Sequence, residues 1–139
     1  STSLAPEEQL CREEPNCRRT QTVPLVLRTV INRYLPGTES ITVHSYLTRS
    51  LFDDATYLVA RRVDVKVGRG AVAMFVRREA QPDLGLEPLI AAPADTQSVM
   101  VRGDPFGYVV DLQFVGPANA SPPLATLRAL ATEPGLEAV

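Results

Sequence analysis

The sequence predicts an α+β fold: a single curved antiparallel sheet of about five strands, with an N-terminal and a C-terminal helix packed on one face. The main observation is the stretch from Tyr57 to Arg78, where two strand-like segments flank Gly68-Arg69-Gly70. Glycine allows the positive φ that a tight reversal needs, so this stretch predicts a long hairpin. Two amphipathic helical stripes, one near each end of the chain, must bury their apolar sides on the sheet.

The two strands of the hairpin differ in pattern. The first alternates, because residues i and i+2 of a strand share a face. One face takes Tyr57, Val59, Val63, Val65 and Val67, and the other takes Leu58, Ala60, Arg62, Asp64 and Lys66. The second strand, 71–76, is apolar on both faces, which is typical of a central strand covered on both sides. The cover comes either from the chain's own helices or from a second subunit.

The remaining elements follow from periodicity and from turn residues. A helix with Thr22 as its N-cap and Pro24 in its first turn runs to Tyr34, because its apolar residues recur at i, i+3, i+4 and i+7. A strand over 41–47 comes next, and strands over 98–102 and 108–115 follow the hairpin. Ser121 is expected to cap the last helix, which opens with two prolines.

The chain is expected to form one domain with three segments. Residues 1–20 read as a polar arm tied down by a disulfide, 21–134 as the α+β domain and 135–139 as a frayed tail. Residues 80–97 hold several prolines and form a long connection. Loops of that length are uncommon and often carry function.

Composition excludes several classes of function. The formal net charge of −2 provides no basic footprint for nucleic acid. No run of 18 apolar residues is present that could span a bilayer. The architecture has the general plan of cystatin-like, NTF2-like and small secretion-chaperone folds, but no motif is shared with them, so this is an analogy of architecture alone.

The two cysteines, Cys11 and Cys17, lie close together in the polar arm. Free cysteines are usually buried, so a pair in an exposed segment favours a disulfide, and disulfides persist outside the cytosol. Two free thiols or half of a metal site are the alternatives. The spacing is not a usual zinc spacing, so we expect no metal and no cofactor.

Catalytic residues are not evident, and we lean towards a protein that is not an enzyme. His44 is the only imidazole, and it shares a strand face with Tyr46. Asp53, Asp54 or Asp64 could orient it, and the candidate lining of a pocket is His44 and Tyr46 with Asp64 or Asp111.

The clustering of arginines is the strongest indication of a binding site in this sequence. Arg61-Arg62 lies in one hairpin strand and Arg77-Arg78 ends the other. A turn at Gly68–Gly70 would place Arg61 opposite Arg77, which is destabilising unless something neutralises the charges. Neutralisation within the protein or by solvent is one reading. An anionic ligand or an acidic partner contacting these four arginines is the other.

We therefore expect a non-catalytic, extracytoplasmic binding domain of a bacterial envelope protein, secreted or anchored to lipid or membrane. Its partner would be a protein or a small ligand, at the sheet face or the 80–97 loop, and it could form a homodimer. The membrane would be contacted only through an anchor outside this sequence. A cystatin-like or NTF2-like enzyme or small-molecule carrier is the first alternative. A small acidic cytosolic protein resembling a chaperone is the second, since the isoelectric point is about 5.4.

Overall fold

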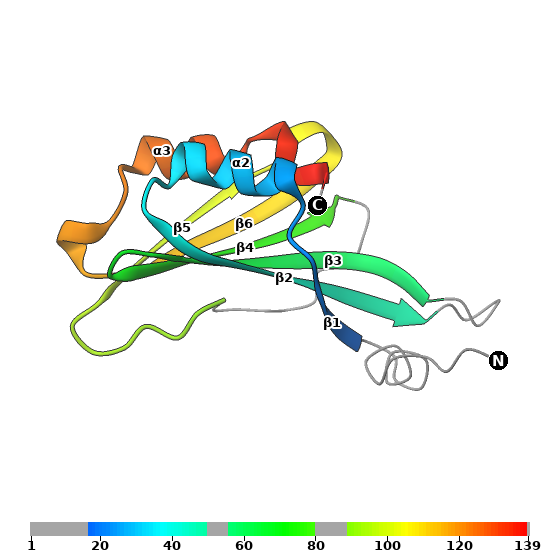
Figure 1. The fold of residues 1–139 in the computed structure, drawn as a ribbon, viewed down its shortest axis with the longest axis horizontal. Coiled ribbons are helices and arrows are strands. Elements are labelled where there is room, and N and C mark those ends of the chain that lie inside the picture. The colour runs from blue at the N-terminus through cyan, green and yellow to red at the C-terminus, as the bar shows by residue number, and fades with distance from the viewer. Residues whose placement is uncertain (1–16, 50–55, 80–88, 139) are drawn as a thin grey trace.

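The computed structural model describes residues 17–49, 56–79 and 89–138. It contains one antiparallel sheet of six strands, in the order β1-β2-β3-β4-β6-β5. The strands are β1 (Cys17–Gln21), β2 (Thr38–Arg49), β3 (Thr56–Val67), β4 (Gly70–Arg78), β5 (Gln97–Gly103) and β6 (Tyr108–Gly116). Helices α2 (Leu25–Tyr34) and α3 (Leu124–Ala131) lie side by side on one face, as Figure 1 shows. The predicted fold class is confirmed, with six strands in place of about five.

The additional strand, β1, lies in the segment that was expected to be an arm. Residues 17–21 pair antiparallel with residues 43–47 of β2. A short polar strand at the edge of a sheet needs no apolar alternation, so periodicity does not reveal it. Cys11 lies outside the described residues, and only the backbone of Cys17 is described. The structure therefore does not support the disulfide, which stays a prediction.

Proline, not a side-chain cap, begins both helices. Pro24 stands at the N-cap of α2 and Pro123 at that of α3, and neither helix has a side-chain capping hydrogen bond. The predicted caps Thr22 and Ser121 are therefore wrong, and Ser121 instead donates its hydroxyl proton to the Pro122 carbonyl. Three 3-10 turns (Pro105–Gly107, Ala118–Ala120 and Pro134–Ala138) complete the described elements.

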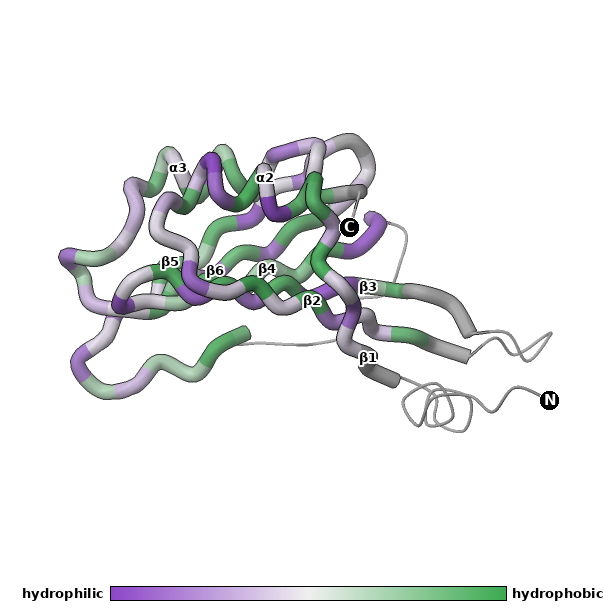
Figure 2. Tube along the Cα trace, viewed as in Figure 1, coloured by the Kyte–Doolittle hydropathy of each residue, from purple (hydrophilic) through white to green (hydrophobic). Residues whose placement is uncertain are grey.

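The main core lies between the helices and the face of the sheet beneath them, here called the helix-side face. Val43, Val63, Met74, Leu112 and Phe114 supply it from four strands, and each is fully buried. Figure 2 shows hydrophobic stretches along these central strands and along the helices facing them. The opposite face of the sheet is called the open face below.

The β3–β4 hairpin has a tighter turn than the sequence suggested. Val67 pairs with Gly70, so Gly68 and Arg69 alone form the turn, and Gly68 has a φ of +54°. Arg61 consequently pairs with Val76 and Arg77 with Ala60. The expected facing of Arg61 and Arg77 is wrong, because a shift of one residue moves a side chain to the other face.

Candidate binding cleft

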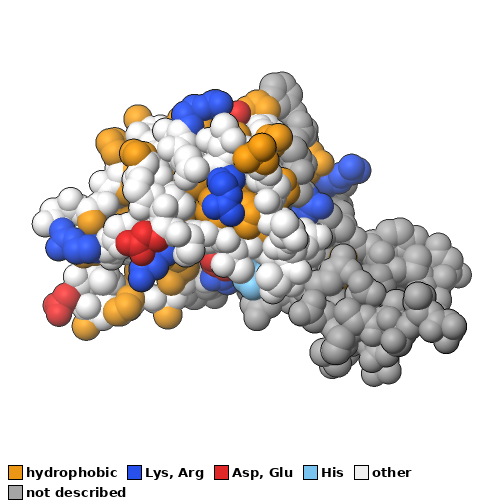
Figure 3. Space-filling view, in the orientation of Figure 1, with side chains coloured by type: hydrophobic (Ala, Val, Ile, Leu, Met, Phe, Trp, Pro, Cys, Tyr) orange, Lys and Arg blue, Asp and Glu red, His pale blue; other side chains and the backbone are white. Residues whose placement is uncertain are grey.

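The open face carries most of the sheet's polar side chains. His44 and Tyr46 of β2 point to it, as do Arg62 and Asp64 of β3, following the predicted alternation. In Figure 3 the only histidine of the chain, in pale blue, reaches the surface. The polar character of this face is therefore determined by the two-residue period of the strands.

Residues 89–96 cross part of the open face and are fixed to it. Leu89 is 5% exposed and packs in a small apolar cluster with Ala60, Ala73 and Phe75. The second face of β4 is thus covered at Ala73 and Phe75 by its own chain. Burial of one such leucine contributes about 1.5–3 kcal/mol.

Gln113 of β6 holds this segment by its side-chain amide. The Ile90 N–H donates to Gln113 Oε1 at 2.8 Å, and Gln113 Nε2 donates to the Ile90 carbonyl at 3.1 Å. The same Nε2 donates to Ser98 Oγ at 2.7 Å. Gln113 is 1% exposed, so all three bonds are shielded from water. The side-chain amide of Gln113 thus pairs with the backbone of Ile90 as the backbone of a neighbouring strand would.

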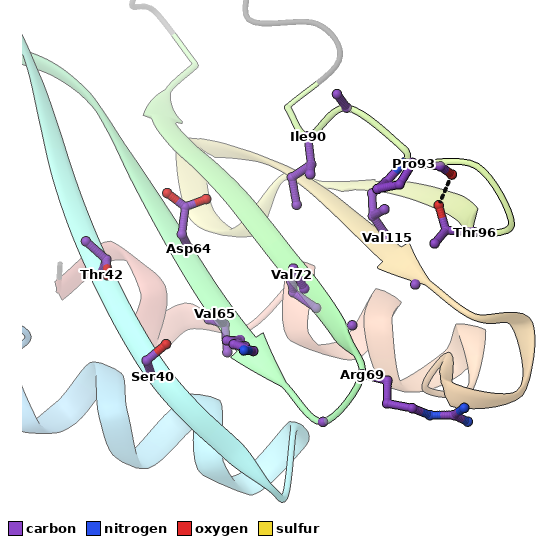
Figure 4. Close-up of a pocket in the computed structure, with 16 residues that line it drawn as sticks. Ser40, Thr42, Asp64, Val65, Arg69, Val72, Ile90, Pro93, Thr96 and Val115 are labelled. Carbon is purple, nitrogen blue, oxygen red and sulfur yellow. Dashed lines mark hydrogen bonds between the residues drawn. The ribbon is translucent and has the colours of Figure 1, made fainter.

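A cleft of about 560 Å³ opens between this segment and strands β2 and β3. Figure 4 shows Thr42 and Asp64 on one side of it, with Ile90 and Pro93 on the other and Val115 beneath them. Ser40, Lys66, Arg69 and Thr96 are its other polar residues. One wall is therefore polar and the other largely apolar, and the volume lies in the range usual for small-molecule sites.

Asp64 is the centre of a charge network at the cleft. Arg62 Nε donates to both of its carboxylate oxygens, at 2.9 and 3.2 Å. His44 Nε2 lies 3.6 Å from Asp64 Oδ2, and His44 Nδ1 lies 3.4 Å from Thr20 Oγ1. The carboxylate therefore enters the cleft with its charge largely offset by the neighbouring guanidinium.

The three predicted pocket residues share a face but not a pocket. His44 and Asp64 are brought together, whereas Tyr46 packs edge to face on Phe75, with ring centroids 5.7 Å apart. Of the three, Asp64 alone lines the cleft. The sequence analysis missed Gln113 and Ile90. A glutamine between the apolar residues Leu112 and Phe114 of β6 was the available signal, because a buried amide needs partners.

The four arginines do not form one cluster. Arg62 and Arg77 point to the open face, whereas Arg61 and Arg78 point to the helix-side face. Arg62 is bound to Asp64, and Arg77 Nη1 donates to the Arg78 carbonyl at 3.5 Å. A single anion site formed by all four arginines, as their clustering in the sequence suggested, would therefore have to span both faces of the sheet.

Other kinds of site find no candidate in the described ranges. There, no group of three or more His, Cys, Asp or Glu side chains could hold a metal ion. None of the helices in the described parts of the chain has the length and apolar character needed to cross a membrane. Comparison of the chain with protein-family models, with curated proteins and with solved structures finds no significant match.

Proposed function

We propose that this chain is a non-catalytic binding domain that takes a small ligand in the open-face cleft. The observation that carries the proposal is the segment fixed by Gln113, because it provides a second wall over a sheet face. Binding sites usually exist before their ligand arrives, which saves the free energy of ordering them. The cleft walls come from a rigid sheet and an anchored segment, so the site meets this condition.

The walls indicate the kind of ligand. Thr42 and Ser40 offer hydroxyl groups that donate or accept hydrogen bonds, and Asp64 offers acceptor oxygens. Ile90 and Pro93 face them with apolar surface. An amphipathic small molecule with one polar edge fits this division. A side chain projecting from a partner protein is the other occupant of matching size.

The test is to fill the cleft from within. Ala71 lines the cleft from β4 and is half-buried, so Ala71→Phe places a ring in the cleft without disturbing the main core. Ala125→Phe, at an exposed position of α3, is the matched control. A library of small-molecule fragments is screened by two-dimensional NMR on the labelled wild-type chain.

We expect the hits to shift the signals of the cleft residues in the wild type and in Ala125→Phe. Their affinity for Ala71→Phe should fall by at least tenfold, because the ring excludes them from the same volume. Hits that bind Ala71→Phe as well as the wild type, or that map to another surface, would refute the assignment of this site.

We further propose that the domain works outside the cytoplasm, as part of a secreted or anchored bacterial envelope protein. The support is the cysteine pair in a polar segment, since oxidising compartments favour such pairs. The redox state of Cys11 and Cys17 decides between this location and the acidic, chaperone-like cytosolic alternative. Two reduced thiols would favour the latter.

A specific contact favours an enzyme or carrier as the second candidate. Thr20, His44 and Asp64 follow one another at 3.4 and 3.6 Å, in the order of a hydroxyl, an imidazole and a carboxylate. That is the order of a nucleophilic triad. However, neither Thr20 nor His44 lines the cleft, and Arg62 competes for the same carboxylate. If the wild-type chain turns over a substrate and His44→Gln abolishes that activity, the enzyme is established over the first candidate.

A further inference from the structure

On the helix-side face, two polar residues lie opposite each other at the margin of the main core. Ser45 of β2 and Arg61 of β3 are paired across the strands, one row beyond Val43 and Val63. Figure 1 shows β2 and β3 extending past the helical layer at this end of the sheet. The site lies on the face opposite the cleft and is independent of it.

Both residues have a buried polar atom with no hydrogen-bond partner among the described residues. Ser45 is 0% exposed, and neither its Oγ nor Arg61 Nε has a hydrogen-bond partner within the described part of the chain. Native proteins leave very few buried polar groups in this state, and each one calls for an explanation. Here two such groups occur side by side on neighbouring strands.

The charge of Arg61 is also uncompensated. No ion pair joins it to a carboxylate among the described residues, whereas Arg62 and Arg102 each hold an aspartate. Burial lowers the pKa of the Arg61 guanidinium, and the electrostatic interaction with Tyr108 acts in the opposite direction. An arginine side chain nevertheless stays protonated in a protein, so its positive charge has no counter-charge among the described residues.

Further groups suited to an anion lie next to it. Arg78 shares the helix-side face and is diagonal to Arg61, a relation that places side chains about 7–8 Å apart. Tyr108 is paired with Arg78 and adds a hydroxyl group. Guanidinium forks and hydroxyl donors are the groups that bind carboxylate and phosphate oxygens.

We propose that Arg61, with Ser45 and Tyr108 beside it, is the binding site of an oxyanion, either a carboxylate or a phosphate group. The anion supplies the counter-charge that the described chain does not, and it accepts hydrogen bonds from the guanidinium. The site differs from the one expected from sequence, because Arg62 is bound to Asp64 and takes no part.

The test is the thermal unfolding of the chain at pH 7 in sodium phosphate, acetate or chloride at equal ionic strength. Arg61→Gln removes the fork, and Arg128→Gln, at an exposed position of α3, removes one positive charge elsewhere. Phosphate stabilises proteins in general by exclusion from their surface. The quantity to compare is therefore the anion-dependent shift in Tm between variants.

We expect phosphate, acetate or both to raise the Tm of the wild type and of Arg128→Gln by a few degrees over chloride, at about 100 times the dissociation constant. Arg61→Gln should show only the general effect, and Ser45→Ala an intermediate one. A specific shift in phosphate alone identifies a phosphate group as the ligand, and one in acetate identifies a carboxylate. Equal shifts in the wild type and Arg61→Gln would overturn the proposal.

A second variant keeps the proposal open to refutation if the first folds poorly. Arg61→Met retains the apolar stem but removes the partly buried charge. In chloride it should unfold at the same Tm as the wild type or higher, because a partly desolvated charge with no counter-charge opposes folding. A marked fall in Tm that is the same in all three salts would show that Arg61 is structural, and the proposal would fail.

Discussion

Gln113 offers the sharpest perturbation of the cleft, because one side chain makes three shielded hydrogen bonds. Gln113→Leu keeps nearly the same volume and removes all three. A typical hydrogen bond contributes about 1 kcal/mol to stability, so the expected loss is about 3 kcal/mol. It would also leave the Ile90 N–H and C=O facing an apolar side chain.

Residues 89–96 can relieve the burial of the unpaired Ile90 groups, which limits the loss of stability. It can leave the sheet and hydrate Ile90, at the expense of the buried Leu89 side chain, which contributes about 1.5–3 kcal/mol. Both routes therefore give a loss of a few kcal/mol. The effect of detachment is local, because it exposes the Ile90 amide to exchange while the amides of β4 stay protected.

Hydrogen exchange at single amides measures this directly. A loss of about 3 kcal/mol corresponds to roughly 100-fold faster exchange at the Ile90 N–H, since every 1.4 kcal/mol is tenfold. Ser98→Ala is the matched control, because it removes one bond of Gln113 and leaves both bonds to Ile90. Exchange at Ile90 unchanged in Gln113→Leu, with unfolding by urea within about 0.5 kcal/mol of the wild type, would refute the reasoning.

Two further predictions concern other parts of the chain. The Tyr34 hydroxyl donates to Glu133 Oε2 at 2.6 Å, so Tyr34→Phe should lower stability by roughly 1–2 kcal/mol at neutral pH. That hydrogen bond, followed by burial, raises the pKa of Tyr34 above 10.0, so its contribution is present below pH 10 and is lost as the pH rises through the folded-state value. Urea unfolding of both proteins between pH 7 and 11 should therefore converge, and a constant difference would contradict this account. For Cys11 and Cys17, thiol blocking followed by mass spectrometry of natively purified protein should find no blocked thiol and a two-proton mass difference on reduction; two alkylated thiols would remove the main support for an extracytoplasmic location.

Much of the fold could be predicted because local patterns carry it. The alternation in 57–67 assigned Val63 and Val65 to the core and Asp64 to the other face, and the structure agrees. The stripe of α2 identified Leu27 and Ile31, which are fully buried. Periodicity of this kind is a property of a single segment, so no tertiary information is needed to read it.

The errors arose where several local solutions are nearly equal. A two-residue and a three-residue turn both fit Gly68-Arg69-Gly70. The two-residue turn places Arg61 and Arg77 on opposite faces of the sheet, whereas the three-residue turn would place them opposite each other on one face. Pro24 and the nearby Thr22 could each begin α2, and the proline does. The polar strand β1 lies at the edge of the sheet and has no apolar alternation by which periodicity could reveal it.

The sequence by itself determined the class of the fold, the faces of the central strands and the side of the sheet on which His44 and Asp64 lie. Tertiary structure alone decided the register of the hairpin, the cover over the open face and the lack of a counter-charge for Arg61 among the described residues. The cleft depends on the contact of Gln113 with Ile90, which are 23 residues apart. The physical reason is that strand period and helix stripe are set within a segment, whereas hydrogen-bond partners and counter-charges depend on segments that only folding brings together.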